Sequence, residues 1–154
     1  MTDTHSAKSL VVGSELVGPV LVATIERTQW YESGMRSAAT GVLTTPHSNI
    51  HTDHAYAKSQ GLPGAIADGM MSTNWISAML VKYFGMGYIA HGELRTKFIK
   101  PIYLDMVVAI RGRVTSVERA PNGAIVYAME VWCEDDKGVK LTVGDAKAEV
   151  PPGR

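Results

Sequence analysis

The stretch that decides the fold is GMMSTNWISAMLVKYF, residues Gly69–Phe84. Its apolar residues recur at helical spacing, and after Trp75 they occupy nearly the whole circumference of a helix. Asp68 stands directly before the stretch, where a carboxylate suits both helix capping and the helix dipole, and Gly85 and Gly87 end it. The pattern predicts one helix, about 24 Å long, that is buried rather than half-exposed.

The chain after this helix alternates apolar and polar residues, which is typical of half-buried strands. Strands are expected at 94–98, 106–117, 125–133 and 139–150, with turns at 121–123 and 135–138. This order predicts an α+β fold, in which an antiparallel sheet wraps around the long central helix. We expect a single domain over residues 1–154, with residues 1–10 as a loosely ordered tail.

The chain before the helix is less regular. Val17–Ile25 is apolar with a mixed period, and it predicts a strand that its internal Gly-Pro pair breaks. Thr28 is expected to cap a short helical piece through Tyr31, whereas residues 41–49 contain many turn-forming residues and predict a loop. Asp53–Gln60 predicts one or two further helical turns, with the aspartate as the cap.

Composition and charge exclude several classes of protein. The chain has 15 basic and 15 acidic residues and no net charge, so nucleic acid is not expected as a partner. The longest apolar run, 76–81, is too short to span a membrane, and residues 1–9 lack the layout of a secretion signal. The single cysteine, Cys133, suits a reducing cytoplasm. Zero net charge also favours self-association, as a homodimer or a larger homo-oligomer.

Cofactor signatures are missing or stand in the wrong context. Residues 85–90 superficially match a dinucleotide-binding loop, but they follow a helix, whereas the pyrophosphate needs a strand before the loop. The sequence has neither a phosphate-binding Gly-Lys-Ser/Thr loop nor a Gly-x-Ser-x-Gly elbow. We therefore expect no cofactor.

The densest polar segment is 46–54, which holds three of the five histidines. A metal site formed by His47, His51 and Asp53 is one interpretation, but no supporting ligand cluster is evident, so no metal is predicted. The plainer interpretation is a set of turn and capping residues, with Asn49 in an Asx turn and His54 exposed.

His51 differs from its neighbours because Ile50 precedes it and an aliphatic helix follows. A half-buried imidazole there is a candidate general acid or base. Gly69 is a second candidate, since a helix-start glycine leaves a backbone N–H that can stabilise charge on a carbonyl oxygen. Alternatively, Gly69 only lets the helix approach the sheet, and Asp68 is only a cap.

Three blocks of this sequence together carry a family resemblance. Residues 50–57 read IHTDHAYA, residues 61–64 read GLPG, and residues 66–70 read IADGM. In this order and at this spacing they resemble the MaoC-like, (R)-specific enoyl-CoA hydratase family, over roughly residues 12–150. The resemblance implies the hot-dog fold and at least a dimer, with two helices back to back under a continuous sheet.

The resemblance also implies a site and exposes two departures from the family pattern. In active hydratases a histidine, here His51, works with an aspartate on a water molecule, while the helix-start glycine, here Gly69, holds the thioester carbonyl. The aspartate position is occupied by Pro46, which cannot transfer a proton. The family usually has histidine just before the glycine, where this chain has Asp68. We therefore expect either a rebuilt His51–Asp68 pair or a weakened site, with His47 as a further candidate partner.

The resemblance implies hydration of a 2-enoyl-CoA, or dehydration of a 3-hydroxyacyl-CoA, with coenzyme A or an acyl carrier as the thioester partner. His51, Asp68 and Gly69 are the expected catalytic residues, and His47, Asn49 and Met70 are expected to contact the substrate. Two alternatives stay open. Asp68 could serve a hot-dog acyl-CoA thioesterase as nucleophile or base, or the chain could be a non-catalytic subunit that binds acyl thioesters or stabilises a partner.

Overall fold

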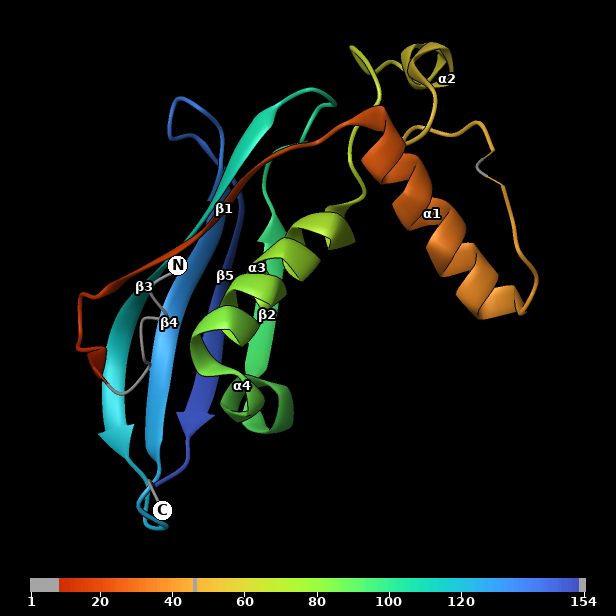
Figure 1. Ribbon diagram of the computed structural model, residues 1–154. Coiled ribbons are helices and arrows are strands. Elements are labelled where there is room, and N and C mark those ends of the chain that lie inside the picture. The colour runs from red at the N-terminus through yellow and green to blue at the C-terminus, as the bar shows by residue number, and fades with distance from the viewer. Residues whose placement is uncertain (1–8, 46, 153–154) are drawn as a thin grey trace, which may run out of the picture.

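The computed structural model describes residues 9–45 and 47–152. Most of the predicted N-terminal tail, and Pro46, lie outside the described residues. The chain forms one five-stranded antiparallel sheet in the order β1-β3-β4-β5-β2, with α3 packed against one face (Figure 1). The elements are β1 Glu15–Val22, α1 Ile25–Thr40, α2 His54–Ser59, α3 Gly69–Phe84, α4 Met86–His91, β2 Glu93–Phe98, β3 Val107–Arg119, β4 Ile125–Glu134 and β5 Lys140–Val150.

The core lies between α3 and the sheet, as the apolar pattern predicts. The helix contributes Ile76, Met79 and Leu80, each at most 1 % exposed, and the strands contribute side chains such as Val108 and Tyr127. β4 buries every second residue from Tyr127 to Cys133, which confirms the alternation seen in the sequence. We call the sheet with α3 and α4 the body of the molecule.

Charged side chains occupy the other face of the sheet. Across the five strands, register neighbours are Glu15, Arg113, Glu130, Asp145 and Arg95. Three of the four neighbouring pairs in this row are of opposite charge and stabilise the sheet modestly, whereas Glu130 and Asp145 are of like charge and oppose this. A charged face of this kind stays in water. The sheet is therefore buried on its α3 side only.

The structure corrects three expectations about element boundaries. β1 is not broken at its Gly-Pro pair, because the strand continues past it with a register shift between Val17 and Val20. α1 is far longer than the predicted piece, and its cap is Thr24, whose Oγ1 accepts from Arg27 N at 3.3 Å. Thr28 is buried inside this helix and does not cap it.

α3 begins and ends where the sequence predicts, but it is not buried all round in the single chain. One side packs on the sheet, whereas Met70 and Val81 on the other side are 46 % and 37 % exposed. α4 was not expected from the sequence. Gly87 lets this short helix approach the β5 backbone, since a Cβ there would collide with the carbonyl of Glu149.

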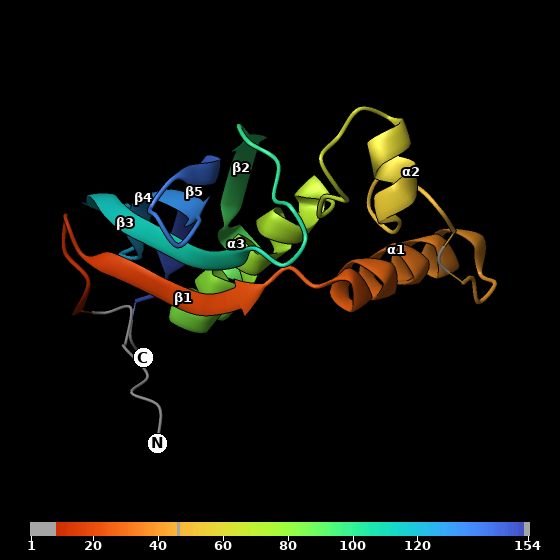
Figure 2. The ribbon, with the colours of Figure 1, turned by 90° about the horizontal axis from the view of Figure 1, so that it is seen from above.

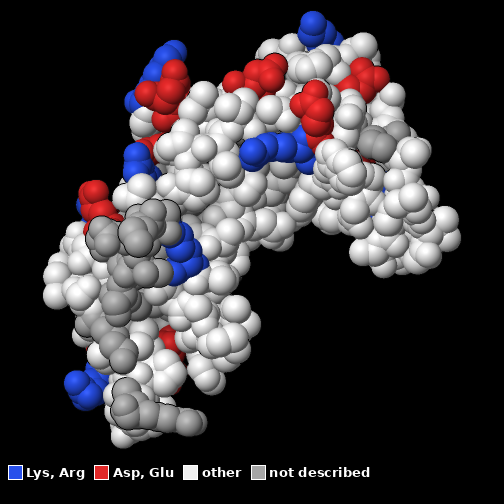
Figure 3. All heavy atoms as spheres, viewed as in Figure 1, with Lys and Arg blue, Asp and Glu red and all other residues white. Residues whose placement is uncertain are grey.

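Residues 24–45 and 47–67, which include α1 and α2, form an overhang that projects away from the sheet (Figures 1 and 2). Thr28 is the only buried residue of α1. A small apolar cluster lies under α2, formed by Ala57, Ala65 and Leu104 with Ile25 and Leu62. In the space-filling view a hollow separates α1 from the body (Figure 3). The candidate site lies where the overhang joins α3.

Candidate active site

His51 is held in a tight turn by hydrogen bonds to its backbone N–H and to its ring. The Oδ1 atom of Asn49 accepts from His51 N at 2.7 Å and from Thr52 N at 3.1 Å, which is the predicted Asx turn. The ring nitrogen Nδ1 lies 3.0 Å from the carbonyl oxygen of Ile66. A carbonyl can only accept, so Nδ1 carries a proton, and Nε2 is the basic nitrogen of the neutral ring.

The carbonyl that receives His51 belongs to a peptide group that is itself hydrogen-bonded. The other end of this peptide, Ala67 N–H, donates to the carbonyl of Ile102 at 2.8 Å. Hydrogen bonds in such a chain polarise one another. When His51 takes up a proton, the Ile66 carbonyl, polarised by this chain of hydrogen bonds, therefore faces the positive ring.

Gly69 opens α3 with a free donor. Asp68 satisfies the next two amides, because its Oδ1 accepts from Met70 N at 2.8 Å and its carbonyl accepts from Met71 N at 3.0 Å. Gly69 N–H has no partner among the described residues. Phe98 lies against this residue, and a Cβ at position 69 would stand 2.8 Å from the ring. The glycine therefore admits the aromatic ring beside an unpaired amide.

His51 and Gly69 line one cavity of about 270 Å³. Its remaining wall is mostly apolar, with Phe98, Ile99 and Pro101 among the residues that form it, and Lys100 is the charged side chain at its edge. Two hydroxyl residues, Ser72 and Thr142, also line the cavity, and the Ser72 hydroxyl donates to Gly69 O at 2.7 Å and accepts from Thr142 Oγ1 at 2.9 Å. The cavity thus combines a basic nitrogen, a free N–H and an apolar surface.

Asp68 does not join His51 in this chain. Its side chain caps α3 and does not line the cavity. No hydrogen bond links the two residues in the described part of the chain. The negative charge of Asp68 acts instead on Tyr31 of α1, since burial first and this charge second raise the pKa of the tyrosine. Pairing of His51 with Asp68 across a subunit interface stays a prediction.

The three residues expected to contact substrate also lie outside the cavity wall. His47 is exposed and accepts a hydrogen bond from Arg36 at 2.7 Å, and Asn49 Nδ2 donates to Glu32 at 2.8 Å, so both tie the loop to α1. Met70 is half-exposed on the outer side of α3. Their proposed contacts with a substrate remain predictions.

Other titratable groups in the described structure have structural explanations. Asp53 caps α2, and hydrogen bonds from Tyr56 N, Ser48 and Ala55 N lower the pKa of its carboxyl. Burial raises the pKa of the Cys133 thiol to about 12, so the thiol stays protonated. Where the structure describes the chain, no group of three or more His, Cys, Asp or Glu residues could hold a metal ion, and no helix is long and apolar enough to cross a membrane.

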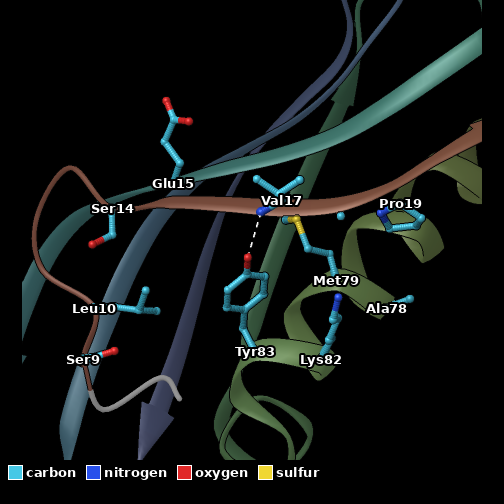
Figure 4. Close-up of a pocket in the computed structure, with 11 residues that line it drawn as sticks. Ser9, Leu10, Ser14, Glu15, Val17, Pro19, Ala78, Met79, Lys82 and Tyr83 are labelled. Atoms are coloured by element: carbon cyan, nitrogen blue, oxygen red, sulfur yellow. Dashed lines mark hydrogen bonds between the residues drawn. The ribbon is translucent and has the colours of Figure 1, made fainter. Parts of the chain in front are cut away.

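A second and larger cavity, of about 950 Å³, lies between β1 and α3 (Figure 4). Lys82 and Tyr83 line it from the helix, and Glu15 and Val17 line it from the strand, with side chains that point away from the helix (Figure 4). The Tyr83 hydroxyl accepts from Val17 N at 3.0 Å across this space. None of the residues predicted for the site lies in it, so size alone does not identify the place of the chemistry.

The fold and the site together define a hot-dog protein with a histidine and a helix-start amide in one cavity. Residues 41–128, more than half of the chain, match the family described as MaoC like domain. The chain therefore belongs to the MaoC-like family.

Solved structures support the fold assignment. The monoamine oxidase regulatory protein of Archaeoglobus superposes with a TM-score of 0.71 at 14 % identity, covering 97 % of this chain and 95 % of its own. The (R)-hydratase of A. caviae involved in PHA biosynthesis gives 0.66 at 16 % identity, covering 94 % and 99 %. An unliganded R-hydratase of Pseudomonas aeruginosa gives 0.64 at 21 % identity, covering 97 % and 92 %. No curated protein matches the sequence.

Proposed function

We propose that this protein is a hydratase or dehydratase that acts on acyl thioesters. One observation carries the proposal: His51, whose Nδ1 bond leaves Nε2 as the basic nitrogen, and Gly69, whose N–H has no partner among the described residues, line the same small, mostly apolar cavity. Addition of water across an enoyl thioester needs a base for the water and a donor for the carbonyl oxygen, and these two groups supply them. Two structural neighbours are (R)-hydratases, which supports this chemistry.

In the proposed reaction the thioester carbonyl oxygen accepts a hydrogen bond from Gly69 N–H. Nε2 of His51 takes a proton from water as the water oxygen forms a bond to C3, and the electrons of the C2–C3 double bond move toward the carbonyl oxygen. The Gly69 N–H stabilises the resulting enolate charge. The protonated His51 then delivers its proton to C2, which restores the carbonyl. Dehydration is the same sequence in reverse.

His51 needs an orienting group, and in the proposed mechanism the Ile66 carbonyl is that group, because it accepts a hydrogen bond from Nδ1. The chain has proline where the family pattern has the aspartate that assists the histidine. A neutral carbonyl stabilises an imidazolium less than a carboxylate does, because only the carboxylate carries a full charge. We therefore expect slower turnover than in an enzyme with an aspartate–histidine pair. The proposal keeps Asp68 as a candidate partner only across a subunit interface.

The proposed substrate is linked to coenzyme A or to an acyl carrier, and Lys100 at the cavity edge and Lys97 on β2 suit an anionic carrier group. The proposed assembly is a homodimer or larger homo-oligomer in the cytoplasm. Self-association is supported by the exposed flank of α3 and the hollow beside it. This side of the molecule carries few charged side chains, and exposed apolar surface of this kind favours contact with another protein (Figure 3). Two structural neighbours are named as complexes, ChsH1–ChsH2 and HadBC.

The test is a panel of short, long and branched 2-enoyl-CoA esters, with loss of the conjugated thioester absorbance and release of free thiol followed in parallel. We expect absorbance loss without thiol release. His51→Ala should lower kcat by about 100- to 10,000-fold, since it removes the general base. His91→Ala is the matched control, because His91 is an exposed histidine at the end of α4.

Two other results would overturn the proposal. Thiol release that depends on Asp68 would show a thioesterase. No signal above buffer with any ester, from protein that is folded, would favour a non-catalytic binding subunit.

A further inference from the structure

We propose that His54 is a positioning residue, which holds the Ala65–Ile66 segment so that the Ile66 carbonyl receives the ring of His51. This inference rests on the proposed role of His51 as the base. The sequence gives no reason to single out His54, because it is exposed at the start of α2 and fits a solvated helix end. Its hydrogen bond shows a more specific role.

The ring of His54 is bonded to the segment next to the one that holds His51. Its Nδ1 accepts from Ala65 N at 3.3 Å, and Ala65 is only 1 % exposed. Gly64 fits closely under the same ring, since a Cβ there would lie 3.3 Å from Nδ1. Without His54, a buried N–H would lose its acceptor, and an unsatisfied buried donor is costly enough to shift the backbone that carries it.

The segment connects the two histidines through consecutive residues. Ile66 follows Ala65 directly, and its carbonyl accepts from His51 Nδ1 at 3.0 Å. Ile66 N donates to the carbonyl of Ile50, which directly precedes His51, also at 3.0 Å. A displacement of Ala65 therefore reaches both the acceptor for the His51 ring and the backbone beside the ring.

The two bonds require opposite tautomers in the neutral rings. His51 donates through Nδ1, so its proton is on Nδ1 and its free lone pair is on Nε2. His54 accepts at Nδ1, so its proton is on Nε2. This opposition gives a spectroscopic signature that is independent of turnover, because ¹⁵N chemical shifts of imidazoles distinguish the two tautomers.

The experiment compares three variants. His54→Ala removes the acceptor, and His54→Asn keeps one, because the asparagine Oδ1 stands at the same number of bonds from the backbone as Nδ1. His91→Ala again serves as the exposed control. We expect the kcat of His54→Ala to fall about 10-fold with little change in KM, because loss of a residue that supports a catalytic group typically has an effect of this size. His54→Asn and His91→Ala should retain most of the wild-type kcat.

The ¹⁵N spectra of His51 give the second measurement. In the wild type and in His54→Asn we expect the Nδ1–H form, whereas in His54→Ala the two tautomers should mix. The proposal is overturned if His54→Ala keeps both the kcat and the Nδ1–H form, or if His54→Asn loses as much as His54→Ala. If the wild type hydrates no ester, the proposed function fails, and the spectra still decide whether His54 orients His51.

Discussion

The body and the overhang are stabilised in different ways. The body buries a continuous apolar core between α3 and the sheet, with Ile76 completely inaccessible. The overhang has one small apolar cluster, and its loop is tied to α1 mainly by polar contacts, such as Asn49 to Glu32 and Thr44 to Ser37. Polar contacts near the surface contribute less net stability than apolar burial. The site therefore joins a rigid helix start, Gly69, to a segment of lower local stability, which carries His51.

The largest expected effect is on the free energy of unfolding, when one apolar side chain is truncated in the core of the body and one in the cluster of the overhang. Ile76→Ala removes a fully buried side chain from the body and should lower the free energy of unfolding by about 2–5 kcal/mol. Leu62→Ala removes a partly buried side chain from the overhang cluster and should cost about 1 kcal/mol. Urea unfolding measures both changes.

Hydrogen exchange separates local from global opening in these variants. In Leu62→Ala we expect faster exchange in α2 while the amides of β3 and β4 stay protected. Ile76→Ala should accelerate exchange in the sheet as well. Equal acceleration of both regions in Leu62→Ala would show that the overhang and the body unfold as one unit, contrary to the comparison drawn above.

The same contrast explains how much of the fold could be predicted. The strands of the body and the whole of α3 follow from periodicity, because a one-sided core imposes period two on strands and helical spacing on a helix. α1 could not be predicted at its full length, since it buries only Thr28 and so carries no apolar stripe. The exposed flank of α3 could not be predicted, because apolar residues such as Met70 and Val81 occur all round the helix and the pattern does not show which of them stay exposed.

Two residues of the candidate site, one histidine and one glycine, could be predicted from the sequence. His51 and Gly69 were selected from the sequence, and the structure brings them to one cavity. The orienting acceptor is a backbone carbonyl, at Ile66, and every residue has one, so no residue type could indicate it. Phe98 could not be paired with Gly69 for a related reason, since their contact depends on how β2 and α3 meet.

A second test addresses the rigid half of the site. In Gly69→Ala the new methyl group would lie 2.8–3.0 Å from three ring atoms of Phe98, so the ring must move away from the amide. We expect kcat to fall about 10- to 100-fold, because the carbonyl donor is displaced or covered. The double variant with Phe98→Ala should recover part of the loss, as measured with the enoyl-CoA absorbance assay.

The recovery tells two explanations apart. If Phe98→Ala restores turnover to Gly69→Ala, the contact with the ring is the cause, and the amide itself tolerates a side chain. If Gly69→Ala has wild-type kcat from the start, the Gly69 N–H is not the carbonyl donor, and only the overhang half of the proposed site remains.

The smallest expected effect concerns Tyr31 of α1 and the charge of Asp68 that acts on it. Burial raises the pKa of Tyr31 above its ordinary value, and the negative charge of Asp68 raises it further. Asp68→Asn removes the second cause and leaves the first, so the pKa of Tyr31 should fall but stay above its ordinary value. The measurement is the phenolate absorbance on titration, taken as the difference from a Tyr31→Phe variant in each background.

The sign of the linked stability follows from the raised pKa. The folded chain holds the Tyr31 proton more tightly than the unfolded chain does, so this contribution to stability is complete below the ordinary tyrosine pKa and is lost as the pH rises through the higher folded value. In Asp68→Asn the loss should begin at the same ordinary tyrosine pKa but end at a lower pH, so the total loss should be smaller. An unchanged Tyr31 titration in Asp68→Asn would contradict the expected effect of the carboxylate on α1, and would leave the cap of α3 as the role of Asp68 within the chain.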